Sequence, residues 1–213
     1  MYKRQILPPT VNVHTVDTVR TREEVADIDA ETVLRVIQAD DAERVLVSAP
    51  SARIINAMMA FTDLFRDLRQ ADYNVMTITS KHGAIINGKK VSRTSFFETL
   101  DNFSATGQKF VLFHYSILSE GINVHGLTNV VLLRNLSTVE MAQTIGRVIR
   151  LDSVDRQRVT DGTLQPRAYH NYRKPTGFIS IPVYNNYGKA TAKRVQATVD
   201  TIFTKGRPAT SWI

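Results

Sequence analysis

Gln143, Arg147 and Arg150 have the side chains and the spacing to contact an anion. They are four and three positions apart, so in a helix they lie at i, i+4 and i+7 and form one polar stripe. A guanidinium offers a rigid fork of N–H donors that matches the oxygens of a phosphate. The segment 143–150 therefore predicts a helix face directed at an oxygen-rich anion such as a nucleoside triphosphate.

Short apolar segments alternate with amphipathic ones, and these elements must position the stripe. Strands are predicted over 44–48, 74–79, 110–114, 130–133 and 177–183, and helices over 51–69, from Ser92 or Ser95 to 103, over 137–150 and over 188–204. Continuous apolar strands separated by helices are typical of a parallel sheet covered on both faces. Such sheets bind ligands at the carboxyl ends of their strands. The following residues fall at these ends: Ser48, Thr79, His114 to Ser119, and Arg134.

Serines mark the starts of the predicted helices. Ser51 can cap the first of them by accepting a hydrogen bond from a backbone N–H group. Ser95 with Glu98, and Ser137 with Glu140, have the spacing of a capping box. The second of these boxes begins the helix that carries the polar stripe.

The stripe belongs to a set of motifs that resembles the second RecA-like domain of superfamily 2 helicases and translocases. Residues 143–150, with the pattern Q-x-x-G-R-x-x-R, match the family's motif VI residue for residue. Residues 118–124 resemble motif V, with Asn123 where an aspartate is usual. Residues 48–51 resemble the end of the motif IV strand, and residues 81–83 resemble the short motif that follows the next strand.

This resemblance, which covers residues 44–151, implies a fold class and a division of the chain. The implied class is α/β, a RecA-like parallel sheet with helices on both faces, of the P-loop NTPase type but without its own Walker A motif. We expect a linker leading into the domain over 1–30 and the core of a helicase C-terminal RecA-like domain over 31–151. A basic, Tyr-rich C-terminal extension over 152–213 is expected to complete the sheet.

The resemblance also implies roles for single residues. Arg150 would be an arginine finger on the γ-phosphate of ATP, Arg147 a second phosphate contact, and Gln143 a residue that lines the nucleotide cleft or couples it to the nucleic-acid site. The implied ATP-binding residues are Gly121, Asn123 and Gly146. The implied nucleic-acid-binding residues are Ser48, Arg53, Lys81, His82 and Ser119.

A surface helix with exposed arginines is the alternative interpretation of segment 143–150. Gly146 argues against it, because a glycine inside a helix costs about 1 kcal/mol relative to alanine unless packing or a close approach requires it. A fixed fork of donors is also what stabilises the charge that develops during phosphoryl transfer.

Residues 83–90 fit the pattern G-x-x-x-x-G-K but make a poor P-loop. Lys90 stands where a magnesium-binding Ser or Thr is required. Asn87-Gly88 between two apolar segments fits a tight hairpin turn better, and no apolar strand ends in an acidic pair. The resemblance therefore implies that a first RecA-like domain, in the same or another chain, holds ATP and Mg²⁺.

The net charge of +7 is concentrated in the C-terminal part of the chain. Residues 1–150 carry 17 Lys and Arg against 16 Asp and Glu, whereas residues 151–213 carry 10 against 4. Tyrosines interleave with these cations: Tyr169, Tyr172, Arg173, Lys174, Tyr184, Tyr187, Lys189, Lys193 and Arg194. This composition suits unpaired bases and phosphates. A solvated basic end with core tyrosines is the alternative.

Several classes of site and location are disfavoured. The chain has no cysteine, which excludes a disulfide framework and a thiolate metal site. Its five histidines are scattered, so we expect no metal bound by protein side chains. It has no apolar run long enough to span a membrane and no signal-peptide pattern at its start. We expect a cytoplasmic protein without membrane contact.

The predicted function is that of the C-terminal motor domain of an ATP-dependent nucleic-acid helicase or translocase. DNA is favoured over RNA, because Gln143 stands where many DEAD-box RNA helicases have histidine. Two alternatives are a stand-alone nucleic-acid-binding module without catalysis and a motor subunit of a restriction or repair complex. The isolated chain is expected to be inactive as an ATPase.

Overall fold

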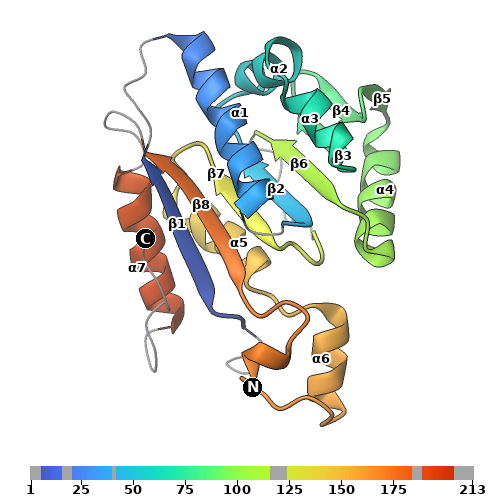
Figure 1. Cartoon of the computed structure of the whole chain (residues 1–213), viewed down its shortest axis with the longest axis vertical. Coiled ribbons are helices and arrows are strands. Elements are labelled where there is room, and N and C mark those ends of the chain that lie inside the picture. Colours follow the sequence, from blue (N-terminus) through green and yellow to red (C-terminus); the bar gives the residue numbers. More distant parts are fainter. Residues whose placement is uncertain (1–5, 16–20, 40–41, 116–123, 184–188, 204–213) are drawn as a thin grey trace.

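The apolar segments pair into one eight-stranded sheet in the order β1-β8-β7-β2-β6-β3-β4-β5 (Figure 1). The computed structural model describes residues 6–15, 21–39, 42–115, 124–183 and 189–203. The strands are β1 (Pro9–Thr15), β2 (Arg44–Ser48), β3 (Asn74–Thr79), β4 (Gly83–Ile86), β5 (Lys89–Val91), β6 (Phe110–His114), β7 (Asn129–Leu132) and β8 (Gly177–Val183). All neighbours pair in parallel except at β4 and β5. The predicted parallel sheet is confirmed.

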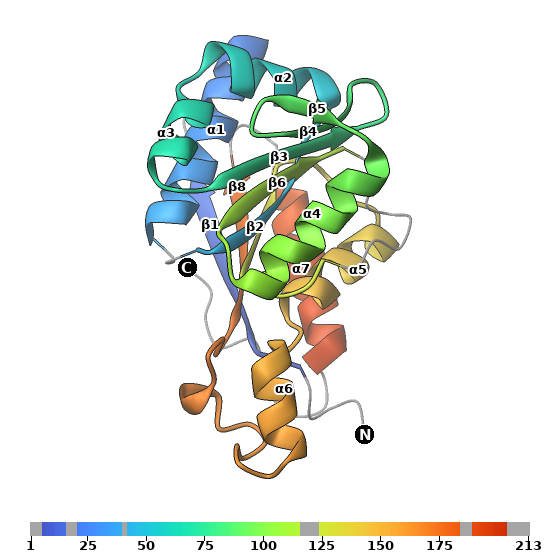
Figure 2. The same ribbon diagram turned by 90° about the vertical axis from the view of Figure 1, so that its right-hand side faces the viewer.

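Helices cover both faces of this sheet (Figure 2). They are α1 (Arg22–Ala39), α2 (Ala52–Phe61), α3 (Leu64–Gln70), α4 (Arg93–Thr106), α5 (Thr138–Val148), α6 (Ser153–Thr160), the short 3₁₀ helix η3 (Tyr169–Asn171) and α7 (Lys189–Phe203). Buried side chains of α1, α2 and α3 form one core with the strands, and those of α4, α5 and α7 form the other. The predicted two-sided covering is confirmed.

Local capping explains where several helices begin. The Ser51 hydroxyl accepts a hydrogen bond from Ile54 N at 3.2 Å and caps α2. Ser137 and Glu140 form the predicted capping box of α5. Glu140 N donates to the Ser137 hydroxyl, with an N to O distance of 3.2 Å, and Ser137 N donates to the Glu140 carboxylate, with an N to O distance of 3.0 Å. The box predicted at Ser95 is wrong, because Ser92 caps α4 by accepting from Ser95 N and leaves Ser95 inside the helix.

The helix predicted over 51–69 is in fact two helices. Thr62 has extended backbone angles (φ −117°, ψ 168°) and ends α2. Its hydroxyl donates to Met58 O and accepts from Leu64 N. In a continuous helix, backbone groups would make these two hydrogen bonds, so the Thr62 side chain replaces them where the helix is interrupted.

Residues 83–91 form the predicted hairpin and not a P-loop. β4 and β5 are antiparallel, and Asn87 and Gly88 connect them with φ angles of 50° and 80°. Positive φ at both central residues is what the favoured two-residue hairpin turn requires.

Two elements, β1 and α1, are not predicted from the sequence. β1 lies inside the segment 1–30, which is predicted as a linker, and α1 begins inside it and continues to Ala39. β1 pairs in parallel with the full length of β8, but polar residues alternate with its apolar ones, so it lacks a continuous apolar run. In α1 the buried face contains small alanines and the polar Asp29 and Thr32, which weakens its apolar periodicity.

Candidate functional site

The three residues of the polar stripe do not all lie on one helix. Gln143 and Arg147 are in α5, but the helix ends at Val148 and Arg150 lies beyond its cap, Ile149. Arg150 forms an antiparallel bridge with Ile6, just before β1. The expected i, i+4, i+7 arrangement is therefore wrong for Arg150, because backbone pairing with the N-terminal segment takes this residue off the helix.

The two arginines differ in burial and influence each other. Arg147 is buried, whereas Arg150 and Gln143 are exposed. Burial, and then the positive charge of Arg150, lower the pKa of Arg147. Two like charges close enough to repel each other interact favourably with an anion placed between them.

Gly146 lies between Gln143 and Arg147 on α5. A Cβ atom at this position would meet no heavy atom within 4 Å. Packing within the described part of the chain therefore does not require this glycine, and the helix surface here is open to the approach of another molecule.

A small pocket joins α5 to the carboxyl ends of β6 and β7. Its lining comprises His114, Arg134, Leu136, Glu140, Gln143, Thr144 and Arg147. Arg134 is 3.0 Å from the Glu140 carboxylate and lies over the Tyr115 ring. Backbone and side-chain hydrogen bonds from Ser137 and Arg134 lower the pKa of Glu140, so its carboxylate is charged.

His114 lies at the bottom of this arrangement and is neutral. Burial, followed by the charges of Arg134 and Arg147, lowers its pKa to about 3. Its Nε2 is 2.9 Å from the Ser48 hydroxyl, and the two residues are register partners on β2 and β6. The sequence placed both at a carboxyl strand end but did not identify this pair.

Ser48 differs in its surroundings from the exposed residues of the predicted nucleic-acid site. Its side chain is completely buried and its hydroxyl is paired with His114, and its predicted role stays a prediction. Ser48 is the last residue of β2, and it has strand neighbours on both sides, in β6 and in β7. This position in a central strand explains its burial.

Arg53, Lys81 and His82 are brought together in a cleft of about 650 Å³. Arg53 is in the first turn of α2, and the other two are in the turn between β3 and β4. The Asn56 side-chain amide is 3.1 Å from Nε2 of His82 and links the two elements. The lining also includes Glu23, Ala26 and Asp27 of α1, Ile54, Ala57 and Phe61 of α2, and Thr62, the C-cap of α2.

The remaining predicted site residues, Ser119, Gly121 and Asn123, lie outside the described residues, as do Tyr184 and Tyr187. Their predicted roles stay predictions.

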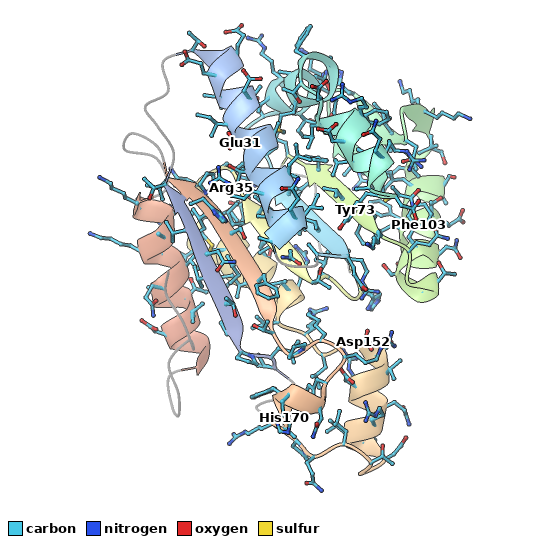
Figure 3. The ribbon with its side chains drawn as sticks, viewed as in Figure 1. Glu31, Arg35, Tyr73, Phe103, Asp152 and His170 are labelled. Carbon is cyan, nitrogen blue, oxygen red and sulfur yellow. The ribbon has the colours of Figure 1, made fainter. Side chains whose placement is uncertain are left out.

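The described tyrosines of the extension are not all available to bases. Tyr172 is buried with Leu7, Leu151 and Leu164 in a small separate core. Its hydroxyl accepts from Arg167 N at 2.9 Å, and the Tyr169 ring meets its edge. This core lies at the end of the molecule that holds Asp152 and His170 (Figure 3). The alternative of core tyrosines is correct for Tyr172.

The described residues offer neither a membrane-spanning helix nor a metal-binding cluster. Over these residues, no helix is long and apolar enough to cross a membrane. The same residues contain no group of three or more His, Cys, Asp or Glu side chains that could hold a metal ion.

Residues 29–152, more than half of the chain, match the family model of the helicase conserved C-terminal domain. The chain belongs to this family. No curated protein matches the sequence. The family match includes α5 and the cleft residues of α2 and of the β3–β4 turn, but ends before most of the extension.

Solved structures show the same fold. The ATP-dependent Type ISP restriction-modification enzyme LlaBIII bound to DNA has a TM-score of 0.55 and 13% identity, over 97% of this chain and 15% of that chain. The E. coli DEAD-box protein SrmB, bound to regulator of ribonuclease activity A, has a TM-score of 0.52 and 12% identity, over 97% of this chain and 99% of that chain. The chain is a second RecA-like domain of the superfamily 2 helicase type, as its motifs predicted.

Proposed function

We propose that this helicase C-terminal domain is half of an ATP-dependent motor that acts on nucleic acid. In this proposal Arg150 and Arg147 act on an ATP whose phosphates and Mg²⁺ are held by a first RecA-like domain. The observation that carries it is the pairing of a buried arginine with an exposed one at the end of α5. An exposed guanidinium can reach across a domain interface, and the buried one beside it is confined by packing.

The donor set of the site fits a triphosphate. Two guanidiniums and the Gln143 amide offer N–H donors to phosphate oxygens, and the open surface at Gly146 leaves room for the nucleotide to approach. Arg150 would stabilise charge that develops on the transferred phosphoryl group, an effect worth about 10³–10⁵ in rate. Gly121 and Asn123 would contact the nucleotide near its ribose.

The cleft formed by Arg53, Lys81 and His82 is the proposed contact for the nucleic-acid backbone, together with Ser119. Cations at the carboxyl ends of the strands suit phosphates. We favour DNA over RNA because of Gln143; the fold is similar both to that of the DEAD-box protein SrmB and to that of LlaBIII, which was solved bound to DNA. The likeness to LlaBIII favours a motor subunit of a restriction or repair complex as the second candidate.

The test is ATP hydrolysis by the chain with and without a first RecA-like domain. The 213 residues alone should show no appreciable turnover, and the joined protein should hydrolyse ATP. Arg150→Ala in the joined protein should lose hydrolysis by about 10³-fold or more while it keeps nucleic-acid binding. Measurement of kcat and of single-strand affinity separates the two effects.

Arg66→Ala is the matched control, because Arg66 is an exposed arginine of α3 whose ion pairs are to Asp63 and Asp67 on the surface. It should leave turnover unchanged. Near-normal hydrolysis by the Arg150 variant would refute the finger assignment. Robust turnover by the chain alone would refute the requirement for a second domain.

A further inference from the structure

The end of α5 is held by residues that come from outside the helix. The last carbonyls of an α-helix have no partner within it and must be paired elsewhere. Here the Lys174 ammonium donates to Val148 O and, at 2.9 Å, to Arg150 O. Leu7 N donates to Ile149 O at 2.8 Å. The carbonyls of Val148, the last residue of α5, and of Ile149 and Arg150 beyond it are therefore all paired.

Lys174 is itself fixed in place. Its side chain is buried, and its backbone N–H donates to the carboxylate of Asp155, which is fully buried. A positive charge at a helix C-terminus also interacts favourably with the helix dipole. The lysine thus lies in a defined position and contacts the backbone at the last residue of α5 and at Arg150 beyond it.

Burial of this lysine has an energetic cost. Removal from water penalises the ammonium and lowers the pKa of Lys174 to about 7. A shorter or apolar residue would avoid this penalty. What the ammonium does achieve is to hold the carbonyl of Arg150, the residue whose side chain must reach the nucleotide.

We propose that Lys174 is a positioning residue for Arg150, which acts by binding the carbonyls of Val148 and Arg150. This inference rests on the proposed function of Arg150. Arg150 is outside the helix, so helical hydrogen bonds do not fix its backbone, and its exposed side chain amplifies any backbone shift. A misplacement of about 1 Å in a catalytic group can reduce the rate on the order of 10²-fold.

Lys174→Met, which keeps much of the side-chain length but donates no hydrogen bond, tests the proposal in the protein joined to its first domain. We expect kcat to fall about 10- to 100-fold with a change in nucleotide KM of less than about threefold. Lys90→Met, at an exposed position of β5, is the control and should be neutral. A Lys174 variant with normal kcat would overturn the proposal.

A double-mutant cycle separates positioning from a general structural role. If Lys174 acts through Arg150, the double variant Lys174→Met with Arg150→Ala should be no slower than Arg150→Ala alone. Independent effects that multiply would overturn the proposal. If Arg150→Ala by itself leaves hydrolysis unchanged, the proposed function fails, and this result is distinct from a failure of the Lys174 variant alone.

Hydrogen exchange on the 213-residue chain supplies a measurement that does not depend on hydrolysis. Lys174→Met should accelerate amide exchange around Ile149 to Leu151 at least about tenfold, while α2 and α4 keep their protection. Lys174→Gln, which retains a polar side chain, serves if the methionine variant does not fold. Unchanged exchange at the end of α5 in a folded variant would contradict the proposed contact.

Discussion

The end of α5 and the cleft between α1 and α2 both offer cations, but they restrain them differently. At α5, Arg147 is buried and the backbone of Arg150 is bound by Lys174 and by the N-terminal segment. In the cleft, Arg53 and Lys81 are exposed. The difference matches the two tasks proposed for these regions, since transition-state stabilisation needs a fixed geometry, whereas attraction of a polyanion depends mainly on charge.

Two buried carboxylates extend this comparison. Asp155, near the end of α5, accepts from Lys174 N and has the Arg158 guanidinium at 3.6 Å. Asp29, on the helix that forms a wall of the cleft, is completely buried, and neither of its carboxylate oxygens has a hydrogen-bond partner among the described residues. Burial raises the pKa of Asp29 to about 8.

The largest effect should come from Asp29→Asn, measured by urea unfolding at pH 5, 7 and 9. Below its ordinary pKa of 3.8, Asp29 is protonated in both the folded and the unfolded state. As the pH rises from about 4 to about 8, only the unfolded state ionises, so stability falls, and above about 8 the loss levels off. The loss should be on the order of 5 kcal/mol, and the asparagine variant should not show it.

Asp101→Asn, at an exposed position of α4, is the control for this experiment and should keep the pH dependence of the parent. If the Asp29 variant and the parent lose stability in parallel from pH 5 to 9, the carboxyl is not the source, and the contrast with Asp155 fails.

Gly177 and Gly146 give the second test, because one is tightly packed and the other is not. Gly146 is in α5, and Gly177, the first residue of β8, lies against the end of that helix. A Cβ atom at Gly177 would lie 2.5 Å from Val148 O, whereas one at Gly146 would meet nothing within 4 Å. Gly177→Ala should therefore destabilise the chain by about 1–3 kcal/mol. Gly146→Ala should stabilise the isolated chain by up to about 1 kcal/mol. Thermal and denaturant unfolding measure both.

Equal effects of the two substitutions would show that the end of α5 is not tightly packed against β8. The same pair can be measured in the joined protein, where Gly146→Ala should slow hydrolysis if the nucleotide approaches this surface. Stability and activity would then change in opposite directions for one substitution.

The smallest effect should be seen in the cleft, with Arg53→Ala and Lys81→Ala. Each should weaken single-strand binding several-fold and reduce the slope of log affinity against log salt by about 1. Fluorescence anisotropy over a salt series measures this, with Lys90→Ala on the hairpin as the control. An unchanged slope in the double variant would place the nucleic-acid contact elsewhere.

Much of the fold could be predicted because its signals are local. The strands at 44–48, 74–79, 110–114 and 177–183 have the predicted bounds, since a strand buried on both faces is a continuous apolar run. The Ser137 capping box and the Asn87-Gly88 turn depend on residues within four positions of each other. β1 and α1 were missed because their apolar residues are small or alternate with polar ones.

By itself, the sequence determined the family motifs and the parallel sheet, and it predicted an anionic ligand for Arg147 and Arg150, because these inferences depend on residue identity and short-range spacing. Only the tertiary structure decided that Arg150 leaves the helix, that Arg147 and Ser48 are buried, and that Lys174 binds the end of α5. These features depend on pairing between segments distant in the chain, such as Lys174 with Arg150 and Ile6 with Arg150. Such pairing leaves no periodic pattern in the sequence.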